Sequence, residues 1–220
     1  MSVSPVSVST HPVVISKISE LRSTENNAKT VRLLISEIST LLAYEATNKS
    51  LQVESLVKSE TPIGASYDLQ SITPTRLCLV PVLRSGLGMT ESFLSLLPST
   101  TEVHHLGLFR EENTLSAVEY YNKLPHPKES GHIDTAFIVD PIIATGNTAC
   151  AAIQIMKEWG VKKIVFTCVL ASRAGIERVS KEWPAGVSLI VGCVDDKLNE
   201  KGYIVPGVGD VGDRLNETGY

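Results

Sequence analysis

Four short apolar runs that alternate with helical patterns limit the folds open to this chain of 220 residues. Runs that are apolar throughout are typical of parallel strands covered on both faces, because a strand with one solvent face alternates apolar and polar residues. The sequence therefore predicts an α/β fold with a mainly parallel sheet flanked by helices. The predicted strands are LCLVPVL at 77–83, TAFIVD at 135–140, KIVFTCVL at 163–170 and VSLIVGCV at 187–194, and the predicted helices are Gly88–Leu97, Thr148–Trp159 and Ala174–Trp183.

The N-terminal segment, which precedes this alternation, is expected to have a structural role rather than to carry the site. Its Ser, Val and Pro residues up to about residue 10 predict disorder, and two amphipathic helices are expected after His11. We expect residues 11–220 to form a single domain, because no repeat, linker or long low-complexity tract divides them. In the clearer, second helix the apolar residues that share one face are Val31, Leu34, Ile35, Ile38, Leu41 and Leu42.

The stretch FIVDPIIATGNTACAAI joins an apolar strand, an acid, a loop of small residues and the start of a helix. Helix starts carry unsatisfied N–H groups and a positive dipole end, so this joint favours a phosphate. Thr145 and Thr148 can add hydroxyl donors, and Asp140 can accept hydrogen bonds from two hydroxyls of a sugar phosphate seated there. Taken alone, the pattern leaves a purely structural cap and turn equally open.

Two arginines stand where a second anionic group could bind. The run VPVLRSGLGM places Arg84 between a predicted strand and a glycine-rich helix start, where a planar guanidinium could grip a diphosphate. Arg110 lies in the segment 103–124, whose two extended halves around a polar turn predict a hairpin flap. Each could instead be a surface residue, with Arg110 paired to Glu111 or Glu112.

The C-terminal segment 201–220 contains GYIVPGVGDVGDR, whose glycines and proline predict an irregular loop. The main chain of a rigid loop can match the alternating acceptor, donor and acceptor edge of a pyrimidine, and Gly207 and Gly209 would permit a close approach. A calcium site around Asp210 and Asp213 is the alternative, but calcium takes more oxygen ligands than this span offers.

The composition narrows the range of partners. A net charge of −4 gives no broad basic surface, so we expect no nucleic-acid partner. No stretch reaches the ~18 apolar residues of a spanning helix and the first residues do not form a signal peptide, so we expect a cytoplasmic protein without a membrane partner. The widely spaced cysteines predict reduced thiols, and the histidines show no metal-ligand spacing.

Together these motifs resemble the type I phosphoribosyltransferases, and among them the uracil phosphoribosyltransferases. VDPIIATGNTA is similar to the fingerprint of a strand, acids and A-T-G-G-[ST], with Pro141 in place of a second acid and Asn147, which tolerates left-handed backbone, in place of the second glycine. VPVLRSGLGM resembles the pyrophosphate loop, with Ser85 where alanine is usual. Residues 103–124 resemble the flap, and KGYIVPGVGDVGDR resembles the uracil-binding hood.

The resemblance, which spans nearly the whole chain from about His11, implies transfer of the phosphoribosyl group of phosphoribosyl pyrophosphate (PRPP) to uracil N1, giving UMP and diphosphate in pyrimidine salvage. It implies magnesium carried by PRPP rather than by protein ligands, a homodimer or homotetramer, and GTP as an allosteric effector in some members. The implied catalytic residues are Asp140, Arg84 and Arg110. The implied PRPP site adds Pro141, Ile142, Ile143, Ala144, Thr145, Gly146, Asn147, Thr148 and Asp210, and the implied uracil site is Ile204, Gly209, Asp210 and Val211.

Two other interpretations stay open. A phosphoribosyltransferase for another base, such as a purine, would share the phosphate loop but should lack the hood. An RNA-binding regulator on the same fold would need a basic face, and the acidic balance of the chain speaks against one.

Overall fold

The computed structural model describes residues 4–111, 117–125 and 133–218, with the side chain of Arg110 left out. The strands are Val6–Val8 (β1), Gln52–Glu60 (β2), Ser66–Thr73 (β3), Leu77–Leu83 (β4), Glu102–Val103 (β5), Leu106–Arg110 (β6), Ala117–Asn122 (β7), Thr135–Val139 (β8), Ile142–Ile143 (β9), Lys163–Ser172 (β10), Val187–Asp195 (β11), Lys197–Leu198 (β12) and Ile204–Val205 (β13). The helices are Pro12–Leu21 (α1), Ala28–Ser50 (α2), Leu87–Leu94 (α3), Asn147–Trp159 (α5), Arg173–Glu182 (α6) and Val211–Asn216 (α7).

The main sheet runs in the order β1-β11-β10-β8-β4-β6-β7, with β5 beside β4 and β9 beside β10. Among the described strands of this sheet, β6 and β7 pair antiparallel and the others pair parallel. The predicted α/β fold with a mainly parallel sheet is thus confirmed. The antiparallel pair β6–β7 lies within the predicted flap 103–124, whose polar turn falls partly on residues 112–116, outside the described residues.

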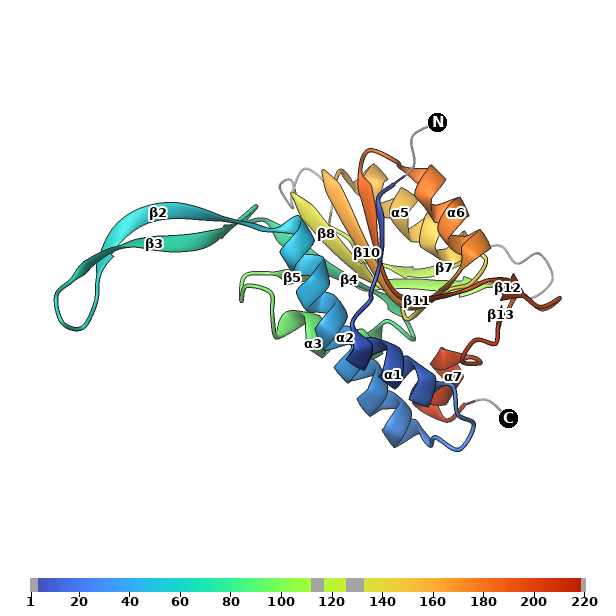
Figure 1. Ribbon diagram of the computed structural model, residues 1–220. Helices are drawn as coiled ribbons and strands as arrows, with labels where there is room; N and C mark the ends of the chain where they lie inside the picture. The colour runs from blue at the N-terminus through green and yellow to red at the C-terminus, as the bar shows by residue number, and fades with distance from the viewer. Residues whose placement is uncertain (1–3, 112–116, 126–132, 219–220) are drawn as a thin grey trace.

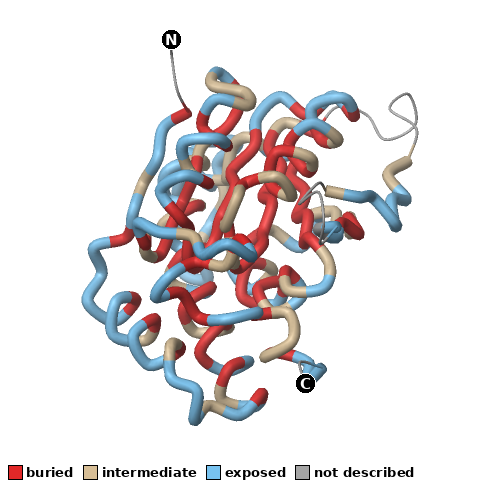
Figure 2. Tube along the Cα trace, turned by 90° about the vertical axis from the view of Figure 1, so that its right-hand side faces the viewer, coloured by how far each residue is buried: buried red, intermediate tan, exposed pale blue. Residues whose placement is uncertain are grey.

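Helices cover the sheet on both faces, with α1, α2, α3 and α7 on one side and α5 and α6 on the other (Figure 1). Successive residues of β4 point to opposite faces of the sheet. Leu77 and Leu79 pack with the helical layer that contains α2, whereas Cys78 and Val80 pack with the layer that contains α5. Figure 2 shows the buried strands enclosed between exposed outer segments. Burial of both faces explains why these strands are apolar throughout.

The structure corrects the predicted disorder of the N-terminus. Val6–Val8 form β1 and pair parallel with Leu189–Val191 at the edge of β11. Leu189 N–H donates to Pro5 at 2.9 Å, and Ser9 N–H donates to Val191 at 2.7 Å. An open strand edge offers unpaired backbone groups, and pairing with them stabilises a segment too short to form a core of its own.

A long antiparallel hairpin, β2–β3, was not predicted from the sequence. It projects from the body beyond the C-terminal end of α2 (Figure 1), and most of its residues are exposed. Its exposed apolar side chains include Val53 at 65% and Ile63 at 90%. An isolated two-stranded hairpin is marginally stable in water, and this arm packs few of its side chains against the body.

The predicted irregular hood holds short regular elements. β13 pairs antiparallel with β12, and α7 forms because the Asp210 side chain caps it by accepting from Asp213 N–H at 3.0 Å. Within the described residues, no helix combines the length and the apolar character required to cross a membrane.

Candidate active site

The predicted site residues meet in one cavity at the carboxyl ends of β4, β8 and β9. Such edges are where open parallel sheets bind ligands. Pro141 is buried behind the cavity wall, and the side chain of Arg110, at the end of β6, lies outside the described part of the chain. The predicted residues that line the cavity are Arg84, Asp140, Ile142, Ile143, Ala144, Thr145, Gly146, Asn147, Thr148, Ile204, Gly209, Asp210 and Val211.

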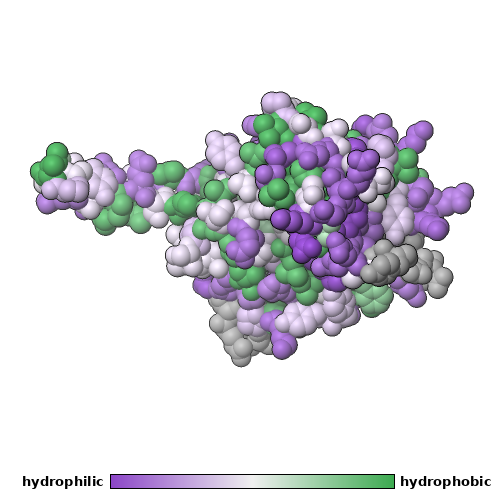
Figure 3. Space-filling view, turned by 90° about the horizontal axis from the view of Figure 1, so that it is seen from below, coloured by the Kyte–Doolittle hydropathy of each residue, from purple (hydrophilic) through white to green (hydrophobic). Residues whose placement is uncertain are grey.

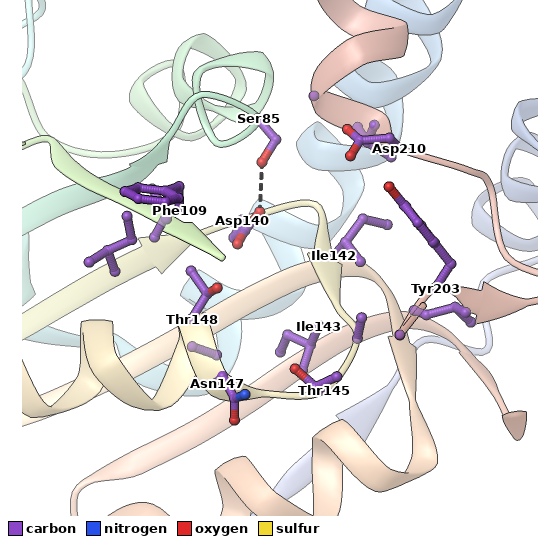
Figure 4. A pocket seen from close by; sticks show the side chains of 18 of the residues that line it. Ser85, Phe109, Asp140, Ile142, Ile143, Thr145, Asn147, Thr148, Tyr203 and Asp210 are labelled. Atoms are coloured by element: carbon purple, nitrogen blue, oxygen red, sulfur yellow. Dashed lines mark hydrogen bonds between the residues drawn. The ribbon is translucent and has the colours of Figure 1, made fainter. Parts of the chain in front are cut away.

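The phosphate loop leads directly into helix α5. Gly146 adopts a left-handed conformation with φ 83°, and Asn147 is the first helical residue. The left-handed conformation favours glycine at 146. Asn147 stands where the family fingerprint has a second glycine, but it is helical, so no left-handed conformation is needed at this position. The N–H groups of the first helical turn lie at the cavity wall, together with the side chains of Thr145 and Thr148 (Figure 4).

The start of helix α6 holds this loop from behind. Ser172 caps α6 by accepting from Gly175 N–H at 2.8 Å, and its hydroxyl donates to Ala144 O at 2.6 Å. A Cβ at Gly175 would lie 2.4 Å from Ala144 O, so only glycine lets the two backbones come this close. The loop is therefore rigidly placed before any ligand arrives.

Asp140 follows β8 and lies at the bottom of the cavity, only 7% exposed. Its Oδ1 accepts a hydrogen bond from the Ser85 hydroxyl at 2.8 Å (Figure 4). Burial raises the pKa of Asp140 to about 6, although hydrogen bonds from Ser85 and from Ile142 N–H lower it and the charge of Asp210 raises it further. The carboxyl is ionised at neutral pH and protonates in mildly acidic solution.

Arg84 reaches from the end of β4 toward the C-terminal segment. Its Nη2 donates to Asp213 Oδ1 at 3.0 Å, and its Nη1 donates to Thr218 Oγ1 at 3.3 Å. The side chain is 55% exposed, and an exposed pair of this kind contributes little free energy. The guanidinium is therefore beside the cavity and can exchange its carboxylate partner for another anion.

The hood loop is tied to the end of helix α1 by a buried ion pair. Arg22 donates to the two carboxylate oxygens of Asp195 at 2.8 and 2.9 Å and to Gly207 O at 2.8 Å. Gly207 N–H donates back to Asp195 Oδ2 at 3.0 Å. Burial alone would raise the pKa of Asp195, but the hydrogen bonds from Arg22 and Gly207 and the charge of Arg22 lower it.

Glycine is required at the bend of this loop. Gly207 has φ 63°, and a Cβ there would lie 2.0 Å from Ile204 O. Ile204 and the segment 209–211, which were predicted as base-binding residues, line the same cavity. A planar ligand in the cavity would face this main chain.

Several cavity residues were not predicted from the sequence as site residues, among them Ser85, Phe109, Tyr120 and Tyr203. Phe109 and Tyr120 come from the two strands of the flap, with ring centroids 6.1 Å apart, so this pair extends the apolar wall. Tyr203 directly precedes Ile204 in the hood motif, and this adjacency in the sequence could have identified Tyr203 as a site residue.

The cavity combines four chemical features. The α5 helix start offers N–H donors to a phosphate, Asp140 can accept from sugar hydroxyls, Arg84 can bind a second anion, and the hood offers main-chain groups to a planar base. Among the described residues, no group of three His, Cys, Asp or Glu side chains is placed to hold a metal ion.

This fold and site define a phosphoribosyltransferase, and similar proteins agree. The AQ2163 protein from Aquifex aeolicus superposes with a TM-score of 0.87 at 32% identity, over 97% of this chain and 98% of that structure. The chain belongs to the uracil phosphoribosyltransferase family, whose family model matches residues 8–218.

Relatives carrying that family name match nearly end to end. The uracil phosphoribosyltransferase of Finegoldia magna is 44% identical over 207 residues, which cover 94% of this chain and 95% of that protein. The uracil phosphoribosyltransferase of Clostridium perfringens is 42% identical over 207 residues, with the same coverage.

Proposed function

We propose that this enzyme transfers the phosphoribosyl group of PRPP to N1 of uracil, producing UMP and diphosphate in pyrimidine salvage. The observation that carries the proposal is the shared cavity of the α5 helix start, Asp140 and the hood. Family membership supports the same substrates.

In the proposed reaction, uracil N1 forms a bond to C1 of the ribose while the bond from C1 to the diphosphate oxygen breaks. The electron pair of that bond leaves with the diphosphate, and the N1 proton passes to water or to the leaving group. Asp140 would hold the ribose hydroxyls, and its negative charge favours positive charge on the sugar. Arg84 and Arg110 would stabilise the departing diphosphate, so alignment and charge stabilisation supply most of the rate enhancement.

The proposed PRPP site consists of the loop from Pro141 to Thr148 with Arg84, Arg110, Asp140 and Asp210. Ile204 and the segment 209–211 would bind uracil. The two Thr hydroxyls of the loop and the N–H groups of α5 support the position of the 5'-phosphate. Magnesium bound to PRPP would neutralise diphosphate charge during transfer.

The deciding assay incubates the protein with PRPP, magnesium and one labelled base: uracil, hypoxanthine or orotate. UMP formation from uracil alone would support the proposal. Product only from another base would refute the assignment of the hood.

A filter-binding measurement with RNA tests the regulator alternative, and retention of RNA without any nucleotide formation would favour it. Addition of GTP at limiting PRPP tests the expected effector, which should raise the rate.

We also propose that the protein is at least a homodimer and that the β2–β3 arm contacts the second copy. The arm stands clear of the body with apolar and polar side chains on its surface (Figure 3). Val57 and Leu69 pair across its strands and are 60% and 39% exposed. Contact with a partner would bury these side chains and stabilise the hairpin.

Light scattering tests the arm. The protein should have at least twice the mass of one chain, and a Val57→Lys, Leu69→Lys variant should shift toward the monomer. The exposed surface variant Lys181→Ala is the control and should keep the assembly. A monomeric parent protein, or an unchanged mass for the double variant, would refute the role of the arm.

A cytoplasmic location is likewise a proposal, supported by four cysteines that are thiols.

A further inference from the structure

The hydrogen bond from Ser85 to Asp140 joins two loops that are far apart in the sequence. Ser85 follows β4 and Asp140 follows β8, and these strands are parallel neighbours with Pro81 opposite Val139. Their carboxyl ends therefore bring the proposed diphosphate loop and the carboxyl of Asp140 side by side, where the side chains of Ser85 and Asp140 point toward one another (Figure 4).

The turn that carries Ser85 is fixed by backbone packing. Gly86 N–H donates to Val82 O at 2.8 Å. A Cβ at Gly86 would lie 2.5 Å from Val139 O and 2.6 Å from Val82 O, so the turn packs directly against the residue before Asp140. Ser85 is thus held at a fixed place relative to the carboxyl, and the bond does not depend on a mobile surface side chain.

The groups around Asp140 have opposing effects on the ionisation of its carboxyl, and the Ser85 hydroxyl is one that favours the ionised form. Burial favours the neutral acid, and Asp210 faces it from the hood with a negative charge, whereas Ser85 and Ile142 N–H donate to the carboxylate. Cys168 of β10 lies nearby, and burial raises its pKa well above the ordinary range, so it stays a neutral thiol. Ser85 is the side-chain donor that opposes burial at this position.

We infer that Ser85 is a positioning residue for the proposed phosphoribosyl transfer, because its hydroxyl holds Asp140 in the orientation and ionisation state that bind the ribose hydroxyls. The inference rests on the proposed function, since it concerns the same site. A carboxylate has about four lone-pair positions. Ser85 and Ile142 N–H occupy two of them, so two remain for the ribose.

The test compares Ser85→Thr with Ser85→Val, two side chains of nearly equal shape that differ by the hydroxyl. Ser85→Ala is measured beside them, and Ser95→Ala, at the exposed serine that follows α3, is the control. For each protein, kcat and kcat/KM for PRPP are followed from pH 5.5 to 9, together with Tm. The acid limb of kcat/KM reports ionisation in the free enzyme.

We expect the parent protein, Ser85→Thr and Ser95→Ala to lose kcat/KM with a midpoint near pH 6. In Ser85→Ala and Ser85→Val the midpoint should rise by about one unit, at the lower end of what a hydrogen bond to a charged group contributes. With half of Asp140 ionised at pH 6 in the parent and about a tenth in the variant, kcat/KM should fall about fivefold at pH 6 and recover toward the parent value at pH 9.

A purely structural role for Ser85 would lower activity equally at all pH values. Identical midpoints for Ser85→Thr and Ser85→Val, or failure of Ser85→Thr to restore the parent profile, would overturn the inference while leaving the proposed function intact. A parent protein that forms no UMP would refute the proposed function, and the role of Ser85 with it.

Discussion

Replacing Arg22 by methionine should destabilise the protein and loosen the hood. The substitution keeps most of the side-chain length but removes the donors to Asp195 and to Gly207 O. It leaves a carboxylate that is only 9% exposed without its cation. Breaking a buried ion pair costs about 3–5 kcal/mol. Because Arg22 is 24% exposed and water can enter, we expect roughly 2–4 kcal/mol.

Thermal unfolding measures this effect. At about 2–4 °C per kcal/mol for a chain of this size, Tm should fall by roughly 4–16 °C. The matched control is Arg173→Met, which removes an exposed Arg–Asp pair with Asp196 and should cost at most about 1 kcal/mol. Adding Asp195→Asn to Arg22→Met should recover part of the loss, because the buried charge is removed.

The pH dependence has a fixed sign. The pKa of Asp195 is lowered in the folded protein, so the stabilisation by Arg22 is present above the ordinary Asp pKa and is lost as pH falls through the lowered value. The Tm gap between parent and Arg22→Met should be full at pH 7 and shrink below about pH 4. Equal losses for Arg22→Met and Arg173→Met, or simple additivity in the double variant, would refute this account of the ion pair.

Two further predictions concern the cavity. Asp140→Asn should lower kcat roughly 10- to 100-fold, because charge-assisted hydrogen bonds to the ribose are lost. The pKa of Asp140 is raised to about 6 in the folded protein, so the ionised carboxylate lowers the stability above that pH and Tm of the variant at pH 8 should equal or exceed that of the parent. A fall in Tm of several degrees would show that Asp140 is structural. Gly175→Ala should cost about 1–3 kcal/mol and weaken PRPP binding measured by calorimetry, since the new Cβ would displace Ala144; unchanged affinity would show that the phosphate loop tolerates the shift.

The sheet and its flanking helices could be predicted from the sequence because burial on both faces leaves a local signature. β4, β8, β10 and β11 are continuous apolar runs, and the predicted helices coincide with α3, α5 and α6 to within a few residues. The joint of β8, the loop with Gly146 and the start of α5 was also predictable, because strand, loop and helix start are contiguous in the chain.

Features that depend on distant contacts were not predictable. The β2–β3 arm packs little against the body, and its apolar residues are few and irregularly spaced: Leu56 and Val57 are adjacent in β2, and the alternation in β3 covers only Tyr67 and Leu69. The bonds of Ser85 to Asp140 and of Arg22 to Asp195 join residues 55 and 173 positions apart, and only the folded sheet brings them together. β1 is three residues long, and its backbone pairs with the edge of β11, which is more than 180 residues away in the sequence.

The place of β1 has a practical consequence. Loss of the first nine residues would bare the outer backbone of β11 along Leu189–Val191, in the middle of a sheet edge flanked by apolar side chains. An unpaired edge of this kind is a template for pairing between molecules. A trimmed form of the enzyme would then aggregate even with every residue of its cavity in place.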